Sequence, residues 1–386
     1  MIRILKSYKE IDLFKKRVNK VFGLALKRVK PIIRDVKLFG DKALISYTRK
    51  YDNVSLTKNT LKISKKDIEE AYQKVDKKVI QTLKDASMVI KKFCENQLPR
   101  SLETEILGIK VSQIIKPIAK IGCYIPGGNY PLPSTALMTI IPAKVAGVKD
   151  IIVCTPPKSH DMILVAADIA GANTIFRVGG AQAIAALAYG TETIPKVHKI
   201  VGPGNIYVTA AKKLVYGEVG LDFLAGPTEL LIIADYGNER FISAEMVAQA
   251  EHDPLATTIL ITTNELLARK VKIEINKQLK SLNSIIANTS IRKRSAIIIV
   301  NSIKEAIEFV NEFAPEHLII ITKDDIINKI ENAGAIFIGE YSSVAIGDYL
   351  IGNHVLPTAG YAKVRAGLNV LDFIKLITAQ EADKKL

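Results

Sequence analysis

One stretch of the sequence carries two polar side chains at a spacing that suits a metal ion. Apolar residues recur at helical spacing in residues 244–254, and Pro254 prevents much continuation, so a helix is predicted there. Gln249 and His252 are three residues apart and therefore share a helix face. An amide oxygen and an imidazole converging from one turn could hold a cation. An amphipathic helix with a histidine on its polar face explains the same pattern, because glutamine is outside the usual set of zinc ligands.

Two further stretches concentrate polar groups. Glu316 and His317 come where a helix gives way to a strand, so they are expected at a strand terminus near a turn. A carboxylate beside an imidazole offers two proton acceptors with different reference pKa values, which suits a reaction with two proton transfers. Residues 347–358 are predicted to form a loop that holds Asp348 and His354. Asp348 could add a carboxylate to the cation site. Each residue alone also has a structural explanation, as a turn cap, a loop histidine or a solvated charge.

Short strands, glycine turns and alanine-rich helices alternate between residues 118 and 215. Three strand–glycine–helix junctions there predict a parallel sheet with helical crossovers. Glycine lets the backbone approach a ligand, and a helix N-terminus favours phosphate. None of the turns is a full G-x-G-x-x-G, so tight turns without a nucleotide explain them equally well. Ser134 or Thr135 is expected to cap the helix over residues 136–145.

A second α/β set follows, with strands predicted at residues 230–234, 257–262, 296–300, 317–321 and 335–338. Residues up to about 107 are predicted to be mainly helical, with breaks at Pro31 and Gly40. The fold class is therefore α/β, with two Rossmann-like lobes of parallel sheets and helical crossovers, preceded by N-terminal helices. The predicted domains are residues 1–116 (helical, part of the first lobe), 117–223 (first Rossmann-like lobe), 224–375 (second lobe) and 376–386 (short C-terminal tail).

The composition describes a globular protein, with 48% hydrophobic and 24% charged residues. The net charge of +15 raises the question of nucleic acid, but no run combines basic and aromatic residues and tryptophan is absent, so no nucleic-acid partner is expected. The three cysteines form no CxxC pair, which fits a reducing compartment. No signal-like or membrane-length apolar run is present. A cytoplasmic protein without a membrane partner is expected.

From about residue 29 to residue 375 the chain resembles the histidinol dehydrogenase family. The resemblance rests on long motifs in a fixed order: Tyr124-Ile-Pro-Gly-Gly, Pro131-Leu-Pro-Ser-Thr135, Val178-Gly-Gly-Ala-Gln182, Val201-Gly-Pro-Gly-Asn205, Ala225-Gly-Pro-Thr-Glu229, Gln249-Ala-Glu-His252, Ala314-Pro-Glu-His317, Gly347-Asp-Tyr349 and Asn353-His-Val-Leu-Pro-Thr358. Agreement at so many ordered places is not chance. The resemblance implies oxidation of L-histidinol to L-histidine through the aldehyde, in two hydride transfers to NAD, as the last step of histidine biosynthesis.

The resemblance also implies roles for particular residues. Those expected to contact NAD are Tyr124, Gln182 and Asn205, so that residues 117–223 become the NAD-binding lobe. Those expected to hold zinc (Zn2+), which orients the substrate in the family, are Gln249, His252 and Asp348. His317 matches the base that takes the alcohol proton, and Glu316 matches the group that activates water to hydrate the aldehyde. The substrate-binding positions are Ser134, Thr228, Gln249, His252, His317, Asp348 and His354.

Two departures from the family pattern bear on these roles. The segment between Asp348 and His354 is one residue shorter than in the family, which could shift His354. The family's C-terminal helical tail, which brings a glutamate to the substrate and a histidine to zinc, has no counterpart in the sequence, so Glu381, Asp383 or water would stand in. A homodimer is still expected, because the long N-terminal helices remain.

Two other functions are alternatives to the predicted oxidation of histidinol. One is a related NAD- and metal-dependent dehydrogenase that acts on another small amino alcohol or polyol. The other is a non-catalytic protein that kept the fold, such as a basic binding module. The joint presence of the Glu316–His317 pair and the three metal-binding candidates speaks against the latter, because loss of function should have removed some of them.

Overall fold

The computed structural model describes residues 2–6, 12–127, 131–224, 226–349 and 355–383, without the side chains of residues 12–21 and Asp348. Two compact units make up the chain. The first unit comprises Leu26–Phe223, Tyr349–Val355 and Leu368–Leu386, and the second comprises Met1–Ala25, Leu224–Asp348 and Leu356–Gly367. The two units are defined by contacts in space, and each combines several segments of the chain. They do not test the predicted domain boundaries, which stay predictions. His354 lies outside the described residues.

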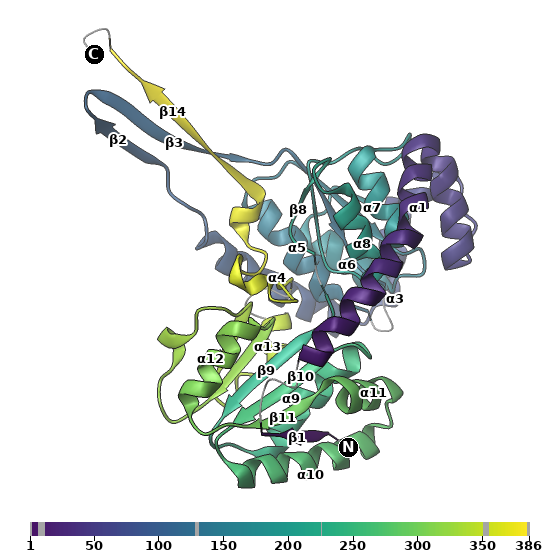
Figure 1. Cartoon of the computed structure of the whole chain (residues 1–386). Helices are drawn as coiled ribbons and strands as arrows, with labels where there is room; N and C mark the ends of the chain where they lie inside the picture. The colour runs from purple at the N-terminus through teal and green to yellow at the C-terminus, as the bar shows by residue number, and fades with distance from the viewer. Residues whose placement is uncertain (1, 7–11, 128–130, 225, 350–354, 384–386) are drawn as a thin grey trace. The chain divides into compact units, whose positions relative to one another are not determined.

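A five-stranded parallel sheet forms the centre of the first unit (Figure 1), in the order β6-β5-β4-β7-β8. Its strands are β4 (Lys120–Tyr124), β5 (Asp150–Thr155), β6 (Thr174–Arg177), β7 (Lys199–Val201) and β8 (Gly220–Leu221). Its crossover helices are α5 (Pro133–Val145), α6 (Asp161–Ala170), α7 (Gly180–Tyr189) and α8 (Ile206–Val215). The order of the strands reverses between β4 and β7, which is the topological switch point where such sheets bind ligands.

In the described part of the chain before this sheet, the helices are α1 (Asp12–Asp52), α2 (Lys58–Leu61), α3 (Lys65–Lys74) and α4 (Lys77–Glu95). The expected break at Pro31 is wrong, because α1 continues through it. The break at Gly40 is confirmed, with φ 50° and ψ −129° inside α1. A Cβ at Gly40 would overlap the carboxylate of Glu192, so only glycine fits this conformation and this contact. None of the helices in the described ranges is long and apolar enough to span a membrane.

A six-stranded parallel sheet forms the second unit, in the order β1-β11-β10-β9-β12-β13. Its strands are β1 (Arg3–Leu5), β9 (Glu229–Ala234), β10 (Thr257–Thr262), β11 (Ala296–Ile299), β12 (His317–Ile321) and β13 (Ala335–Ile338). The predicted strands are confirmed almost residue for residue, whereas β1 was not predicted. Setting β1 aside, the order reverses between β9 and β12 as it does in the first unit, so the two sheets share one topology.

Helices cover both faces of the second sheet, which is why its strands are apolar on both sides. Ile232 packs on one face with residues of α9 (Glu239–His252), α10 (Glu265–Leu282) and α11 (Ile285–Arg294). Ile233 packs on the other face with residues of α12 (Ile303–Phe313). Each fully buried side chain of this kind stabilises the fold by about 1.5–3 kcal/mol, so the two cores fix the strand ends where the polar residues stand.

A second, antiparallel sheet belongs to the first unit and consists of β2 (Leu102–Ile106), β3 (Ile109–Pro117) and β14 (Ile374–Glu381). Leu107 and Gly108 form the two-residue β2–β3 turn with positive φ angles of 52° and 78°. The sheet extends as an arm from the rest of its unit (Figure 1). Most of the segment expected as a short tail is therefore a strand, held by pairing with residues far away in sequence.

Candidate active site

The Glu316–His317 pair stands where the chain enters β12, as predicted. Helix α12 ends at Phe313, and Ala314 adopts a left-handed conformation with φ 54° and ψ 67°. This conformation costs a non-glycine residue about 1–2 kcal/mol, so the core on either side must impose it. The tight reversal brings Glu316 and His317 to the amino edge of the second sheet, where they are only 8% and 5% exposed.

Backbone groups orient the Glu316 carboxylate. Its Oε2 accepts a hydrogen bond of 2.9 Å from the backbone N–H of Glu229, the first residue of the neighbouring strand β9. The same oxygen lies 3.6 Å from Nδ1 of His317. The imidazole packs at a tilt of 35° against Phe337, with ring centroids 6.1 Å apart. A buried carboxylate and imidazole with fixed directions are suited to removing protons from a substrate.

Glu229 and Thr358 hold a further segment against this edge, and the sequence analysis gave neither a role. The Glu229 side chain accepts the backbone N–H of Ala359 at 3.2 Å from each carboxylate oxygen. Thr358 Oγ1 accepts the backbone N–H of Gly226. Both residues end motifs that carry the family resemblance, which was the available signal. The predicted substrate residue Thr228 directly precedes Glu229, and its carbonyl accepts the N–H of Thr257 at 2.9 Å.

Helix α9 brings two of the predicted metal ligands to the same edge. Gln249 is buried and His252, the last residue of the helix, is exposed. One turn before Gln249, Glu245 Oε2 accepts the N–H of Val344 at 3.4 Å, which ties α9 to the start of α13 (Val344–Tyr349). Asp348 follows Val344 by one turn of α13. The expectation of a loop at Asp348 is therefore wrong, because a six-residue helix is too short to show periodicity in the sequence.

No three described His, Cys, Asp or Glu side chains form a group that could hold a metal ion. Of the three predicted zinc ligands, only His252 is a residue of these types whose side chain the structure describes. Gln249 is an amide, and the side chain of Asp348 is not among those described. Their donor atoms, one imidazole nitrogen and two oxygens, match the chemistry of zinc ligands in part. The hydrogen bond between Glu245 and Val344 also relates two of these ligands. Gln249 lies one turn after Glu245 on α9, and Asp348 lies one turn after Val344 on α13.

The three predicted cofactor residues lie at the carboxyl edge of the first sheet. Tyr124 ends β4, and its buried hydroxyl accepts the N–H of Gly180 at 3.1 Å. Burial raises the pKa of Tyr124 to about 12, an effect that the Gly180 N–H opposes and the Asp52 carboxylate increases. The phenol is therefore neutral at physiological pH and keeps a proton to donate. Gln182 is buried in the first turn of α7, which begins at Gly180.

The other two sequence candidates of the first unit have structural roles as well. Asn205 is the N-cap of α8, and its Oδ1 accepts the N–H groups of Tyr207 and Val208 at 3.0 and 3.1 Å. Because the Oδ1 atom is used in the cap, the side-chain N–H groups of Asn205 are the ones that would donate to NAD in the predicted role. Ser134 is buried in the first turn of α5. The expectation that Ser134 or Thr135 caps this helix is wrong, because Pro133, with its preset φ, begins the helix and Leu132 is the N-cap.

Among the described residues, the structure thus places the predicted positions in two groups, one at an edge of each sheet. Comparison with solved structures first defines the fold. It is shared with succinate-semialdehyde dehydrogenase from Burkholderia pseudomallei, with a TM-score of 0.53 and 12% identity over 93% of this chain and 90% of that one. At this identity the likeness concerns the fold alone.

Closer relatives define the family. The family model for histidinol dehydrogenase matches residues 15–386. A histidinol dehydrogenase from Methanocaldococcus jannaschii is 47% identical, with 99% of this chain and 92% of that protein covered. The crystal structure of histidinol dehydrogenase from Elizabethkingia anophelis superposes with a TM-score of 0.91 and 37% identity, covering 100% of this chain and 91% of that one. The chain belongs to the histidinol dehydrogenase family and is an oxidoreductase.

Proposed function

We propose that the protein oxidises L-histidinol to L-histidine through L-histidinaldehyde, with two molecules of NAD, as the last step of histidine biosynthesis. The observation that carries this proposal is the buried Glu316–His317 pair, whose carboxylate is aligned by the backbone N–H of Glu229. Two successive oxidations need two proton acceptors, and this pair offers a carboxylate and an imidazole from adjacent residues. Family membership supports the choice of substrate.

His317 acts in the first oxidation by taking the proton of the alcohol oxygen while hydride leaves the carbon. Glu316 acts in the second by taking a proton from the water that adds to the aldehyde, which gives a hydrated aldehyde with a hydride to lose. The hydrogen bond from Glu229 fixes the carboxylate, so little reorganisation is needed as the proton moves. Burial of both side chains keeps competing water away from the reacting groups.

We assign Gln249, His252 and Asp348 to a zinc ion. When bound, zinc supplies a positive centre that anchors the substrate's imidazole and amine. Three features support the assignment: the mixed nitrogen and oxygen donors, the common register of α9 and α13, and the position of His252 at the C-terminus of α9. A helix C-terminus carries partial negative charge and therefore favours a cation.

We assign Tyr124, Gln182 and Asn205 to NAD, which supplies the hydride acceptor when bound. Tyr124 ends β4 and Asn205 follows β7, the two strands that flank the switch point of the first sheet, and Gln182 follows β6 at the same edge. The N-termini of α7 and α8 also lie at this edge and favour a pyrophosphate. Ser134, Thr228 and His354 complete the proposed substrate-binding set.

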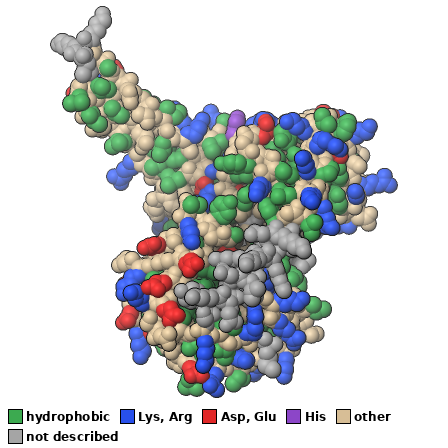
Figure 2. All heavy atoms as spheres, viewed as in Figure 1, with side chains coloured by type: hydrophobic (Ala, Val, Ile, Leu, Met, Phe, Trp, Pro, Cys, Tyr) green, Lys and Arg blue, Asp and Glu red, His purple; other side chains and the backbone are tan. Residues whose placement is uncertain are grey.

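We infer a homodimer, with the arm formed by β2, β3 and β14 as the supporting feature. Apolar side chains are exposed along it (Figure 2), namely Leu102, Ile106, Leu107, Ile114, Leu376 and Ile377. Exposed apolar surface of this kind favours association. A monomer with Leu376→Asp and a dimer of the wild type, measured by sedimentation equilibrium, would support it, and a monomeric wild type would refute it. The cytoplasmic location expected from the sequence stays a prediction.

The test of the proposed reaction is the amount of NADH formed per L-histidinol, measured before metal removal, after chelation and after zinc is restored. We expect two NADH per histidinol, a loss on chelation and recovery with zinc. Absence of NAD reduction by zinc-loaded protein that binds NAD would refute histidinol as substrate. A screen of other small amino alcohols and polyols under the same conditions then separates the alternative dehydrogenase from a non-catalytic protein.

A further inference from the structure

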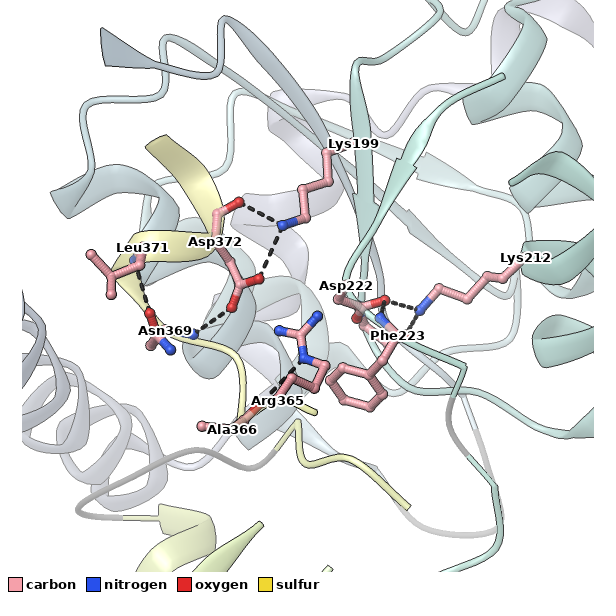
Figure 3. A network of polar contacts seen from close by, with 10 residues as sticks. Lys199, Lys212, Asp222, Phe223, Arg365, Ala366, Asn369, Leu371 and Asp372 are labelled. Atoms are coloured by element: carbon pink, nitrogen blue, oxygen red, sulfur yellow. Dashed lines mark hydrogen bonds and ion pairs between the residues drawn. The ribbon is translucent and has the colours of Figure 1, made fainter. Parts of the chain in front are cut away.

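A buried ion pair lies beside the proposed cofactor turn of the first unit. Lys212 of α8 pairs with Asp222, which follows β8, and the two residues are 1% and 5% exposed (Figure 3). Asp222 Oδ1 also accepts the N–H of Phe223 at 2.6 Å. Burying a lysine and an aspartate is an inefficient source of stability, because desolvation offsets most of their attraction. The backbone groups that this pair binds explain its presence better than its contribution to stability does.

The ion pair binds both backbone polar groups of Gly202, the residue that follows β7. Lys212 Nζ donates to the Gly202 carbonyl at 2.7 Å, and the Gly202 N–H donates to Asp222 Oδ2 at 2.7 Å. Gly202 has φ 115°, and a Cβ there would overlap the carbonyl oxygen of Tyr124. The pair thus fixes Gly202 in a glycine-only conformation against the end of β4.

Two of the three proposed NAD residues depend on this arrangement. Tyr124 is the residue whose carbonyl Gly202 approaches, and Asn205 follows Gly202 by three residues as the N-cap of α8. Lys212 stands on the same helix, so α8 anchors the Gly202–Asn205 turn at both ends. We propose that Lys212 and Asp222 are positioning residues for NAD, which set the turn that carries Asn205. This inference rests on the proposed assignment of NAD to the first unit.

The chain offers a matched control on the same strand. Lys199 begins β7, and its Nζ lies 3.0 Å from Asp372 Oδ1 and donates to the Asp372 carbonyl at 2.6 Å (Figure 3). This pair is also largely buried, with 12% of each side chain exposed, but it contacts the opposite end of β7. Loss of this pair therefore tests stability without touching the Gly202–Asn205 turn.

The experiment compares the wild type with K212M/D222N and with K199M/D372N. Removing both charges of a pair avoids an unpaired buried charge, and methionine and asparagine preserve the side-chain volumes. We expect the NAD Kd from isothermal titration calorimetry to rise about tenfold in K212M/D222N, because the Gly202 carbonyl loses its donor. Zinc content should stay unchanged in both variants, and K199M/D372N should keep the wild-type NAD Kd.

Thermal unfolding of both double variants separates positioning from stability. A tenfold weaker NAD Kd in K212M/D222N at a melting temperature equal to that of the control supports the inference. An unchanged NAD Kd in K212M/D222N, or an equal weakening in the control, overturns it. If K212M/D222N does not fold, K212R decides, because it keeps both charges of the pair but changes the donor geometry at the Gly202 carbonyl, with a Kd at least about threefold weaker expected. A wild type that binds no NAD instead refutes the assignment of NAD on which the inference rests.

Discussion

The two sheets share one strand order but place their polar residues at opposite edges. In the first unit, the proposed NAD residues stand at the end of β4 and after β6 and β7, at the carboxyl edge. In the second unit, Glu316, His317 and Glu229 stand at the amino edge, where β12 and β9 begin. On the proposed assignments, the rule that open α/β sheets bind ligands beyond their carboxyl ends describes only the first sheet. Topology alone does not locate the chemistry of this fold.

Helix polarity explains why the two edges suit different ligands. In both sheets the crossover helices begin near the carboxyl edge and end near the amino edge, so the first edge gathers partial positive charge and the second partial negative charge. A pyrophosphate-bearing cofactor fits the former. A cation fits the latter, where α9 ends at His252. On the proposed assignments, one topology used twice binds an anionic cofactor at the carboxyl edge of one sheet and a cation at the amino edge of the other.

The largest expected effect comes from His317→Asn, which removes the proposed base at the amino edge. We expect the rate of histidinol oxidation to fall about a thousandfold, the usual contribution of a general base, while the NAD Kd stays unchanged. Steady-state kinetics and calorimetry measure the two. His198→Asn, at an exposed histidine of the first unit, is the control and should change neither. Wild-type turnover by His317→Asn would contradict the assignment of the catalytic base to the amino edge of the second sheet.

Glu316→Gln should have the next largest effect, with oxidation of histidinaldehyde slowed about a hundredfold. Glutamine keeps an acceptor for the Glu229 N–H but cannot take a proton from water. Single-turnover measurements with histidinol and with the aldehyde separate the two steps. Glu308→Gln, on the exposed side of α12, is the matched control. A deficit confined to the alcohol step would show that the roles of Glu316 and His317 are exchanged.

Tyr124→Phe tests the other edge and should have a smaller effect. The variant loses one neutral hydroxyl that accepts the N–H of Gly180 and, in the proposed role, donates to the cofactor. We expect the NAD Kd to rise about three- to tenfold, as for one hydrogen bond, with zinc content unchanged. Calorimetry and metal analysis measure the two. Loss of zinc in this variant would contradict the separation of cofactor and metal between the two edges.

The smallest effect concerns stability at alkaline pH. Burial raises the pKa of Tyr124 to about 12, so the folded state holds its proton where the unfolded state loses it. Stability from this group is therefore complete below about pH 10 and is lost as pH rises toward 12. By pH 11 the wild type should lose about 1 kcal/mol more than Tyr124→Phe, relative to pH 8. Denaturant unfolding at both pH values measures the difference, and parallel losses would contradict it.

The sequence predicted the second sheet well, because its strands are continuous apolar runs bounded by turns. It also predicted that Glu316 and His317 lie at a strand terminus, since a helix pattern ends just before them. It did not predict β1 or β14, because each depends on pairing with residues far away in the chain. Lys212 could not be recognised either, because a buried lysine and an exposed one have the same local sequence pattern.

The most direct test of the account is hydrogen exchange of backbone amides with each ligand in turn. NAD alone should slow exchange at residues 124–127, 179–182 and 202–205 of the first sheet's carboxyl edge. Zinc with histidinol should slow exchange at residues 226–229, 249–253 and 314–317 of the second sheet's amino edge. Slowing by NAD at residues 235–238, the carboxyl edge of the second sheet, with no change in the first unit, would contradict the account.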